Sequence, residues 1–169
     1  LVNVTQLNGI TLSDNKVTDI SVLAKSAGNL NAVLIDNNNI SDISALAGNP
    51  DMELVTMENN HISDISALAG MSKLKYLSAY HNEITDITTL GDCKLLYYVD
   101  LGENQIADIS PLVASAVSKR YLLLQNNCFT DISTLYRDTK YEYLSLYGNP
   151  IEDYSILREL TSINHIYDI

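Results

Sequence analysis

An asparagine recurs every 22 or 23 residues along almost the whole chain, and this period constrains the fold more than any other feature. When each unit is numbered so that this asparagine is position 9, apolar residues recur at positions 4, 6, 11, 14 and 17. Such a period is typical of stacked repeats, in which each unit contacts only its neighbours. The asparagines are Asn15, Asn38, Asn60, Asn82, Asn104, Asn127 and Asn149.

Each unit carries signals for a strand, a turn and a short helical segment. Apolar positions 4 and 6 alternate with positions 3, 5 and 7, which predicts a half-buried strand that pairs with its neighbours in a parallel sheet. The asparagine amide can donate and accept, so it can satisfy backbone groups of the inward turn. An aspartate then precedes Ile/Tyr-Ser/Thr-x-Leu, which predicts an N-cap of a short helical turn on the outer side. These aspartates are Asp19, Asp42, Asp64, Asp86, Asp108, Asp131 and Asp153.

The repeat resembles the leucine-rich repeat L-x-x-L-x-L-x-x-N-x-I, in the 22-residue class of bacterial internalins and a eukaryotic phosphatase-regulatory subunit. Residues 107–112, Ala-Asp-Ile-Ser-Pro-Leu, are particularly similar to internalins. The resemblance implies an α/β solenoid: a right-handed leucine-rich repeat superhelix with a parallel concave β-sheet and short 3-10 turns or irregular segments on the convex side. We expect residues 1–169 to form a single domain of seven repeats plus a partial eighth.

Two regions depart from the pattern. Lys119 replaces an apolar residue at position 1, so we expect a local distortion within 113–121. Residues 163–169 begin an eighth unit and stop, and neither end of the chain shows an obvious cap. Solenoid ends expose core, so we expect a trimmed segment, end-to-end self-association or continuation into further domains. The chain begins without methionine, and any targeting peptide is expected outside it.

Tyrosines are concentrated on the predicted concave face. The chain has 11 Tyr but one Phe and no Trp, which indicates that tyrosine is placed for more than bulk. Position 3 holds tyrosine in four consecutive units, and neighbouring strands lie about 4.8 Å apart, so the rings should form a row about 14 Å long. Two interpretations stay open: cross-strand stabilisation of the sheet, or a rigid amphipathic binding surface. The row is Tyr76, Tyr98, Tyr121 and Tyr143; Tyr80 and Tyr147 occupy position 7.

The same face is acidic, since no lysine or arginine falls on positions 3, 5, 7 or 8 of any unit. An acidic, tyrosine-lined concavity favours a basic or hydroxyl-rich partner, hence a protein or a glycan. The predicted partner-binding residues are Tyr76, Tyr80, Tyr98, Asp100, Tyr121, Tyr143 and Tyr147, with Glu58, His81 and Glu103 around them.

Other functions find little support in the sequence. The net charge is −11 without a basic cluster, which argues against nucleic acid as a partner. No apolar run approaches the roughly 20 residues that span a bilayer, so no membrane insertion is expected. Cys93 and Cys128 lack zinc spacing and are predicted to be free thiols. No nucleophile motif, phosphate loop or metal-ligand spacing is recognisable, so we expect neither a catalytic site nor a cofactor.

The sequence therefore predicts a non-enzymatic module for adhesion or protein interaction. Its resemblance to internalins implies a bacterial protein at the cell surface or in the extracellular space. Two alternatives remain: a structural spacer within a larger surface protein, and an intracellular protein similar to the phosphatase regulator.

Overall fold

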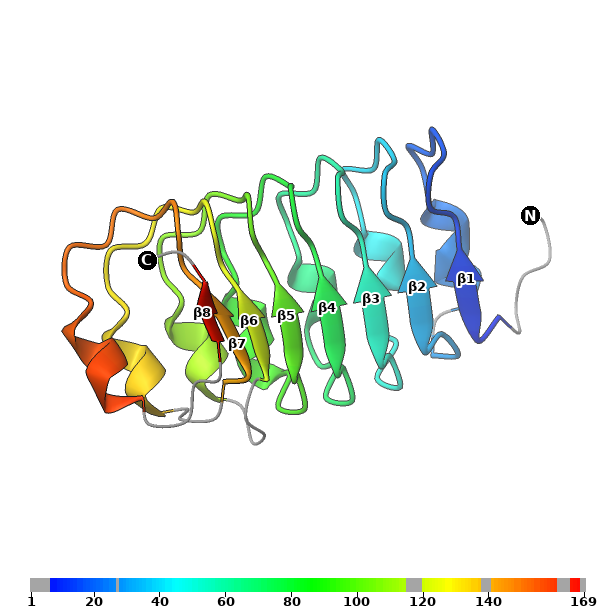
Figure 1. Ribbon diagram of the computed structural model, residues 1–169. Helices are drawn as coiled ribbons and strands as arrows, with labels where there is room; N and C mark the ends of the chain where they lie inside the picture. Colours follow the sequence, from blue (N-terminus) through cyan, green and yellow to red (C-terminus); the bar gives the residue numbers. More distant parts are fainter. Residues whose placement is uncertain (1–6, 27, 115–119, 138–140, 161–164, 168–169) are drawn as a thin grey trace.

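Short parallel strands stacked in chain order form one continuous sheet (Figure 1). The computed structural model describes residues 7–26, 28–114, 120–137, 141–160 and 165–167. Each strand pairs with the next at matching repeat positions, as in Leu77 with Val99. The eight strands are β1 (Gly9–Thr11), β2 (Ala32–Leu34), β3 (Leu54–Thr56), β4 (Tyr76–Ser78), β5 (Tyr98–Asp100), β6 (Tyr121–Leu123), β7 (Tyr143–Ser145) and β8 (His165–Tyr167).

A short 3-10 helix follows each of the first seven strands, and these helices lie across the coil from the sheet (Figure 1). They are η1 (Ser21–Ser26), η2 (Ser44–Leu46), η3 (Ser66–Leu68), η4 (Thr88–Asp92), η5 (Ser110–Ala114), η6 (Ser133–Arg137) and η7 (Ser155–Glu159). The predicted leucine-rich repeat solenoid, with its parallel sheet and short 3-10 turns, is confirmed.

The core lies between the sheet and the 3-10 helices. In the unit of β4, Leu77, Ala79 and Ile84 are fully buried, and the side chains of Ile87 and Leu90 close the opposite side. The same positions are buried in the neighbouring units, so one hydrophobic core runs through the stacked coils. A single coil could not bury these side chains alone, and stacking therefore drives the fold.

The repeated asparagine links each coil to the preceding one. Asn104 Nδ2 donates to the carbonyl oxygens of Leu101 and Gly102 in its own turn, both at 3.1 Å. It also reaches Ala79 O in the preceding coil at 3.0 Å, while its Oδ1 accepts from Ile84 N–H at 3.0 Å. The predicted satisfaction of turn backbone groups is thus confirmed, and one side chain serves two coils. The same contacts recur at Asn38, Asn60, Asn82 and Asn127.

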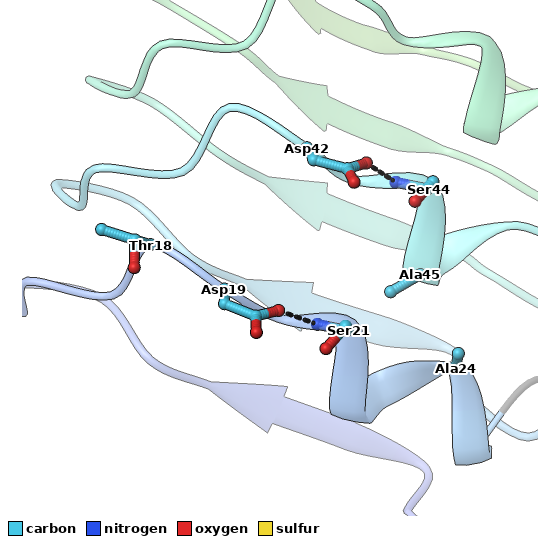
Figure 2. Close-up of a pocket in the computed structure, with 7 residues that line it drawn as sticks. All are labelled: Thr18, Asp19, Ser21, Ala24, Asp42, Ser44 and Ala45. Carbon is cyan, nitrogen blue, oxygen red and sulfur yellow. Dashed lines mark hydrogen bonds between the residues drawn. The ribbon is translucent and has the colours of Figure 1, made fainter.

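The aspartate before each 3-10 helix lies one residue before the N-cap position, where the sequence predicted it to be the N-cap itself. Asp42 Oδ1 accepts from the backbone N–H of Ser44, the first helical residue, at 2.7 Å, and Asp19 pairs with Ser21 in the same way (Figure 2). The N-cap position itself is occupied by Ile43, which makes no side-chain cap. The carboxylate therefore closes an Asx turn from Asp42 to Ser44, two residues on, instead of forming an N-cap. The hydrogen bond from Ser44 lowers the pKa of Asp42.

Of the two regions that depart from the repeat pattern, the partial eighth unit can be described. The strand expected in the partial eighth unit is present, since β8 pairs with β7 from His165 to Tyr167. The distortion expected near Lys119 falls on 115–119, outside the described residues, as do 1–6 and 168–169 at the two ends.

Candidate functional site

Four tyrosines stand in a row at the first residue of β4 to β7. The sheet register pairs Tyr76 with Tyr98, then Tyr121 with each of its neighbours, Tyr98 and Tyr143. The ring centroids are 4.0 Å apart for the first pair, 5.6 Å for the second and 6.4 Å for the third. The expected row of rings is therefore present, and it opens towards the C-terminal strands.

The tightest pair in this row stacks face to face. The ring planes of Tyr76 and Tyr98 meet at only 7°, so each ring covers one face of the other and leaves its edge for other contacts. Burial, and then a hydrogen bond with Tyr76, raises the pKa of Tyr98 well above its ordinary value. Tyr121 is more open, with 37% of its surface exposed. The row thus combines a closed, rigid end with an accessible one.

Two carboxylates lie beside the row. Glu58 accepts a hydrogen bond from the hydroxyl of Ser78 at 2.5 Å. Asp100 departs from the expected open position, because only 9% of it is exposed. Its Oδ1 turns back to accept the backbone N–H of Gly102 at 3.0 Å, which tucks the carboxylate against the end of its strand. Burial, with a smaller contribution from Glu58, raises the pKa of Asp100 to about 6.

A second carboxylate site forms where β4 and β5 end. Tyr80 donates its hydroxyl to Glu103 Oε1 at 2.5 Å, and His81 Nδ1 lies 2.6 Å from Glu103 Oε2. Both oxygens of Glu103 are therefore engaged, and the hydrogen bonds from Tyr80 and His81 lower the pKa of this carboxyl. The same contact raises the pKa of Tyr80 to about 12. The three side chains form one connected cluster.

His81 and Glu103 occupy a backbone position that suits neither residue. Position 8 has a positive φ in every unit from the first to the seventh. Residues that tolerate this conformation occupy five of these positions: Asp14, Asn37, Asn59, Asn126 and Gly148. His81, at φ 54°, and Glu103, at φ 52°, are the exceptions. A strained position of this kind costs roughly 1–3 kcal/mol and is found most often at functional sites.

Two residues that the sequence reasoning missed complete the face. A Cβ at Gly102 would collide with the side chain of Gln125, so glycine makes room for that side chain. Gln125 is only 9% exposed, and its Oε1 is a buried acceptor that has no hydrogen-bond partner among the described residues. Gly102 and Gln125 occupy position 7 in the two units between those of Tyr80 and Tyr147. Tyr147 is 40% exposed. A glycine followed one unit later by a long side chain in the same column was the available signal.

All ten residues predicted for partner binding lie on the sheet or on the turns that follow β3 to β7. Their contacts divide them into the tyrosine row with Glu58 and Asp100, and the cluster of Tyr80, His81 and Glu103. Tyr147 stands beyond Gln125 in the column of Tyr80. We call these ten residues the concave site: Glu58, Tyr76, Tyr80, His81, Tyr98, Asp100, Glu103, Tyr121, Tyr143 and Tyr147.

A hollow on the convex side and the two cysteines lie outside the concave site. The hollow in Figure 2 has a volume of about 330 Å³ and is lined by Thr18, Asp19, Ser21, Ala24, Asp42, Ser44 and Ala45. It follows from the repeated Asp-Ser contacts and shares no residue with the concave site. Cys93 is buried, which raises the pKa of its thiol to about 11, whereas Cys128 is exposed; both are free thiols.

The described part of the chain shows neither a group of metal-ligating side chains nor a membrane-spanning helix. There, no three His, Cys, Asp or Glu side chains are grouped so that they could hold a metal ion. None of the described helices is both long and apolar enough to cross a membrane.

Comparison with known proteins identifies the family. The model of the leucine-rich repeat family, two copies, matches residues 72–114. Internalin C2 of Listeria monocytogenes is 30% identical, with a TM-score of 0.85 over 96% of this chain and 71% of that one. The internalin inlF of the same organism is 27% identical, with a TM-score of 0.86 over 99% of this chain. The chain therefore belongs to the internalin-like leucine-rich repeat proteins.

Other comparisons set the limits of this relationship. The chain spans 56% of the length of inlF. The receptor kinase HAESA of Arabidopsis, solved with a peptide hormone, shares the fold with a TM-score of 0.76 at 20% identity, over 92% of this chain and 29% of that ectodomain. No curated protein sequence matches the chain.

Proposed function

We propose that this chain is a non-enzymatic recognition module that binds a basic segment of a partner protein through the concave site. The observation that carries the proposal is the row of four tyrosines in register beside Glu58 and Asp100, which have no lysine or arginine partner among the described residues. Tyrosine supplies large and rigid contact area at a low cost in side-chain entropy, which suits it to binding surfaces.

The distribution of charge supports a basic partner. At the edge of the sheet, carboxylates are paired: Glu53 with Lys75 at 2.8 Å and Glu142 with Arg120 at 3.0 Å. Within the described residues, neither Glu58 nor Asp100 has a lysine or arginine partner. Positive charges on a partner would compensate the negative charge of Glu58 and Asp100. The negative charge of this face would also speed the association of basic partners.

The geometry of the rings favours a protein over a glycan. A sugar ring packs against an open aromatic face, whereas the stacking of Tyr76 on Tyr98 closes one face of each ring. The pair also offers ring edges and hydroxyl oxygens, which suit polar and charged groups of a polypeptide. An arginine can donate several hydrogen bonds to tyrosine hydroxyls and carboxylates at once.

The known relatives support the same class of function and suggest where it operates. Leucine-rich repeat folds serve as interaction scaffolds, and the HAESA ectodomain was solved with a peptide hormone. The similarity to Listeria internalins supports a bacterial protein that acts in adhesion or interaction at the cell surface or as a secreted protein.

The test compares binding of defined probes by the chain and by a variant that carries serine at Tyr76, Tyr98, Tyr121 and Tyr143. The probes are an extended arginine-serine peptide of about eight residues, long enough to cover the row, its glutamate-serine counterpart and a neutral oligosaccharide. A matched control carries serine at Tyr97 and Tyr136, which are exposed tyrosines outside the row. Circular dichroism checks that each variant is folded.

We expect the arginine peptide to bind the chain and the control, and to bind the four-tyrosine variant at least roughly tenfold more weakly. Preference for the oligosaccharide would assign the site to a glycan. Equal binding by both variants would move the site away from the tyrosine row. Absence of binding by every probe would contradict the proposal and favour a spacer.

A further inference from the structure

The cluster of Tyr80, His81 and Glu103 joins a titratable side chain directly to the concave site. The 2.6 Å contact between His81 Nδ1 and Glu103 Oε2 holds the imidazole, whose side chain is 61% exposed. Glu103 is fixed from its other side by Tyr80, so the carboxylate cannot turn away without losing that hydrogen bond. Protonation of His81 would therefore convert an anionic pair into a neutral one at a fixed place.

We infer that partner binding at the concave site is proton-linked through the His81–Glu103 pair, so that a basic partner is released on acidification. This inference rests on the proposed function and adds a regulation to it.

The backbone supports a functional role for the pair. In the first three units, position 8 forms a ladder of short side chains in which Asn37 donates to Asp14 and Asn59 donates to Asn37. His81 and Glu103 replace this ladder at the same positive φ. Asparagine would suit the backbone better at both positions. The exchange of asparagine for an acid–imidazole pair therefore has a conformational cost that packing does not explain, because His81 is exposed.

The charge of the site changes in one direction as the pH falls. Near neutral pH, the site carries three negative charges, on the carboxylates of Glu58, Asp100 and Glu103. An imidazole is a side chain that can gain a proton between pH 7.5 and pH 5.5, and the raised pKa of Asp100, about 6, means that this carboxyl is neutralised within that interval. Protonation of both groups changes the charge of the site from −3 to −1. Attraction of a basic partner would weaken accordingly.

The surroundings of the two groups contain few other charges. His81 lies in a hollow that is also lined by Asn59, His61 and Glu83, and its own carboxylate is Glu103. Asp100 interacts with Glu58 and with the phenols of Tyr80 and Tyr98. His61 pairs with Glu83 at 3.3 Å, also across one repeat, but at position 10, outside the concave site. His61 is therefore a matched control for His81.

The experiment measures the affinity of the arginine-serine peptide at pH 7.5 and pH 5.5, at constant ionic strength. The proteins are the chain, His81→Asn and His61→Asn. The first substitution places a residue that tolerates positive φ, so it should fold. We expect the chain and His61→Asn to lose roughly tenfold or more in affinity at pH 5.5, and His81→Asn to lose roughly threefold or less.

Two results would overturn the inference and leave the proposed function standing. One is equal affinity of the chain at both pH values, with binding at pH 7.5 still dependent on the four tyrosines. The other is the same loss at pH 5.5 in His81→Asn as in the chain. If the peptide does not bind the chain at pH 7.5, the proposed function fails and the inference fails with it.

Discussion

The two halves of the concave face share one backbone but carry different chemistry. Along β1 to β3, position 3 is filled by Gly9, Ala32 and Leu54, and position 8 by the Asp14–Asn37–Asn59 ladder. From β4 to β7, position 3 is tyrosine, and position 8 is histidine in the unit of β4 and glutamate in the unit of β5. The register of the sheet is unchanged across this boundary. The scaffold positions therefore define the fold, and the face positions are free to define binding.

The largest expected effect lies in the scaffold. Asn104→Ala removes one acceptor and one donor group that together serve four backbone partners, and it leaves buried groups in two coils unsatisfied. We expect a loss of about 3 kcal/mol or more in the free energy of unfolding. Among the described residues, the exposed Asn15 donates only to its own turn, so Asn15→Ala should cost about 1 kcal/mol or less. Urea denaturation measures both. Equal losses would contradict the division between linked and local asparagines.

The next effect concerns Asp100, whose pKa in the folded state, about 6, lies above the ordinary aspartate value of 3.8. Well below pH 3.8 both states are protonated, and the group costs nothing. As the pH rises towards 6, the unfolded state loses its proton first, so the folded state becomes relatively less stable. Asp100→Asn removes this penalty and keeps the acceptor for Gly102 N–H. We expect it to stabilise the protein by about 2–3 kcal/mol at pH 7.5 and by little at pH 4.

Denaturation of the chain and of Asp100→Asn at both pH values checks this prediction. A difference in stability that does not depend on pH would show that Asp100 is not penalised by burial.

A smaller gain is expected at Gln125, whose Oε1 is a buried acceptor without a hydrogen-bond partner among the described residues. Gln125→Met keeps the length of the side chain over Gly102 and removes the unpaired polar atom. We expect about 1 kcal/mol of stabilisation. Thermal unfolding is the measurement, and a lower melting temperature would indicate that the amide makes a useful contact in solution.

The smallest effect is expected at position 8. His81→Asn relieves the positive-φ strain but also removes the contact to Glu103, so we expect stabilisation of about 0.5–1 kcal/mol. His61→Asn, where φ is not positive, should not stabilise the protein. Urea denaturation distinguishes them. Destabilisation of His81→Asn would mean that the contact with Glu103 outweighs the strain.

The repeat scaffold could be predicted almost completely from the sequence because one period locates every strand, turn and buried column. Asn104 and Leu77 are at the predicted places for that reason. Side-chain direction was less accessible. Asp100 turns back onto Gly102 N–H, and Glu103 meets both Tyr80 and His81, contacts that depend on rotamers instead of period. The run of Asp14, Asn37 and Asn59 at position 8 did carry a signal for positive φ, against which His81 and Glu103 could have been recognised.

The most direct test of the separation between scaffold and binding face measures two quantities on one protein. For the variant with serine at Tyr76, Tyr98, Tyr121 and Tyr143, the free energy of unfolding and the affinity for the arginine-serine peptide are compared with those of the chain. We predict that unfolding stays cooperative and loses about 2 kcal/mol or less, while the affinity falls at least roughly tenfold. Unchanged affinity would contradict the account, because the tyrosine row would then not matter to binding. Loss of cooperative folding would also contradict it, because the row would then be part of the scaffold.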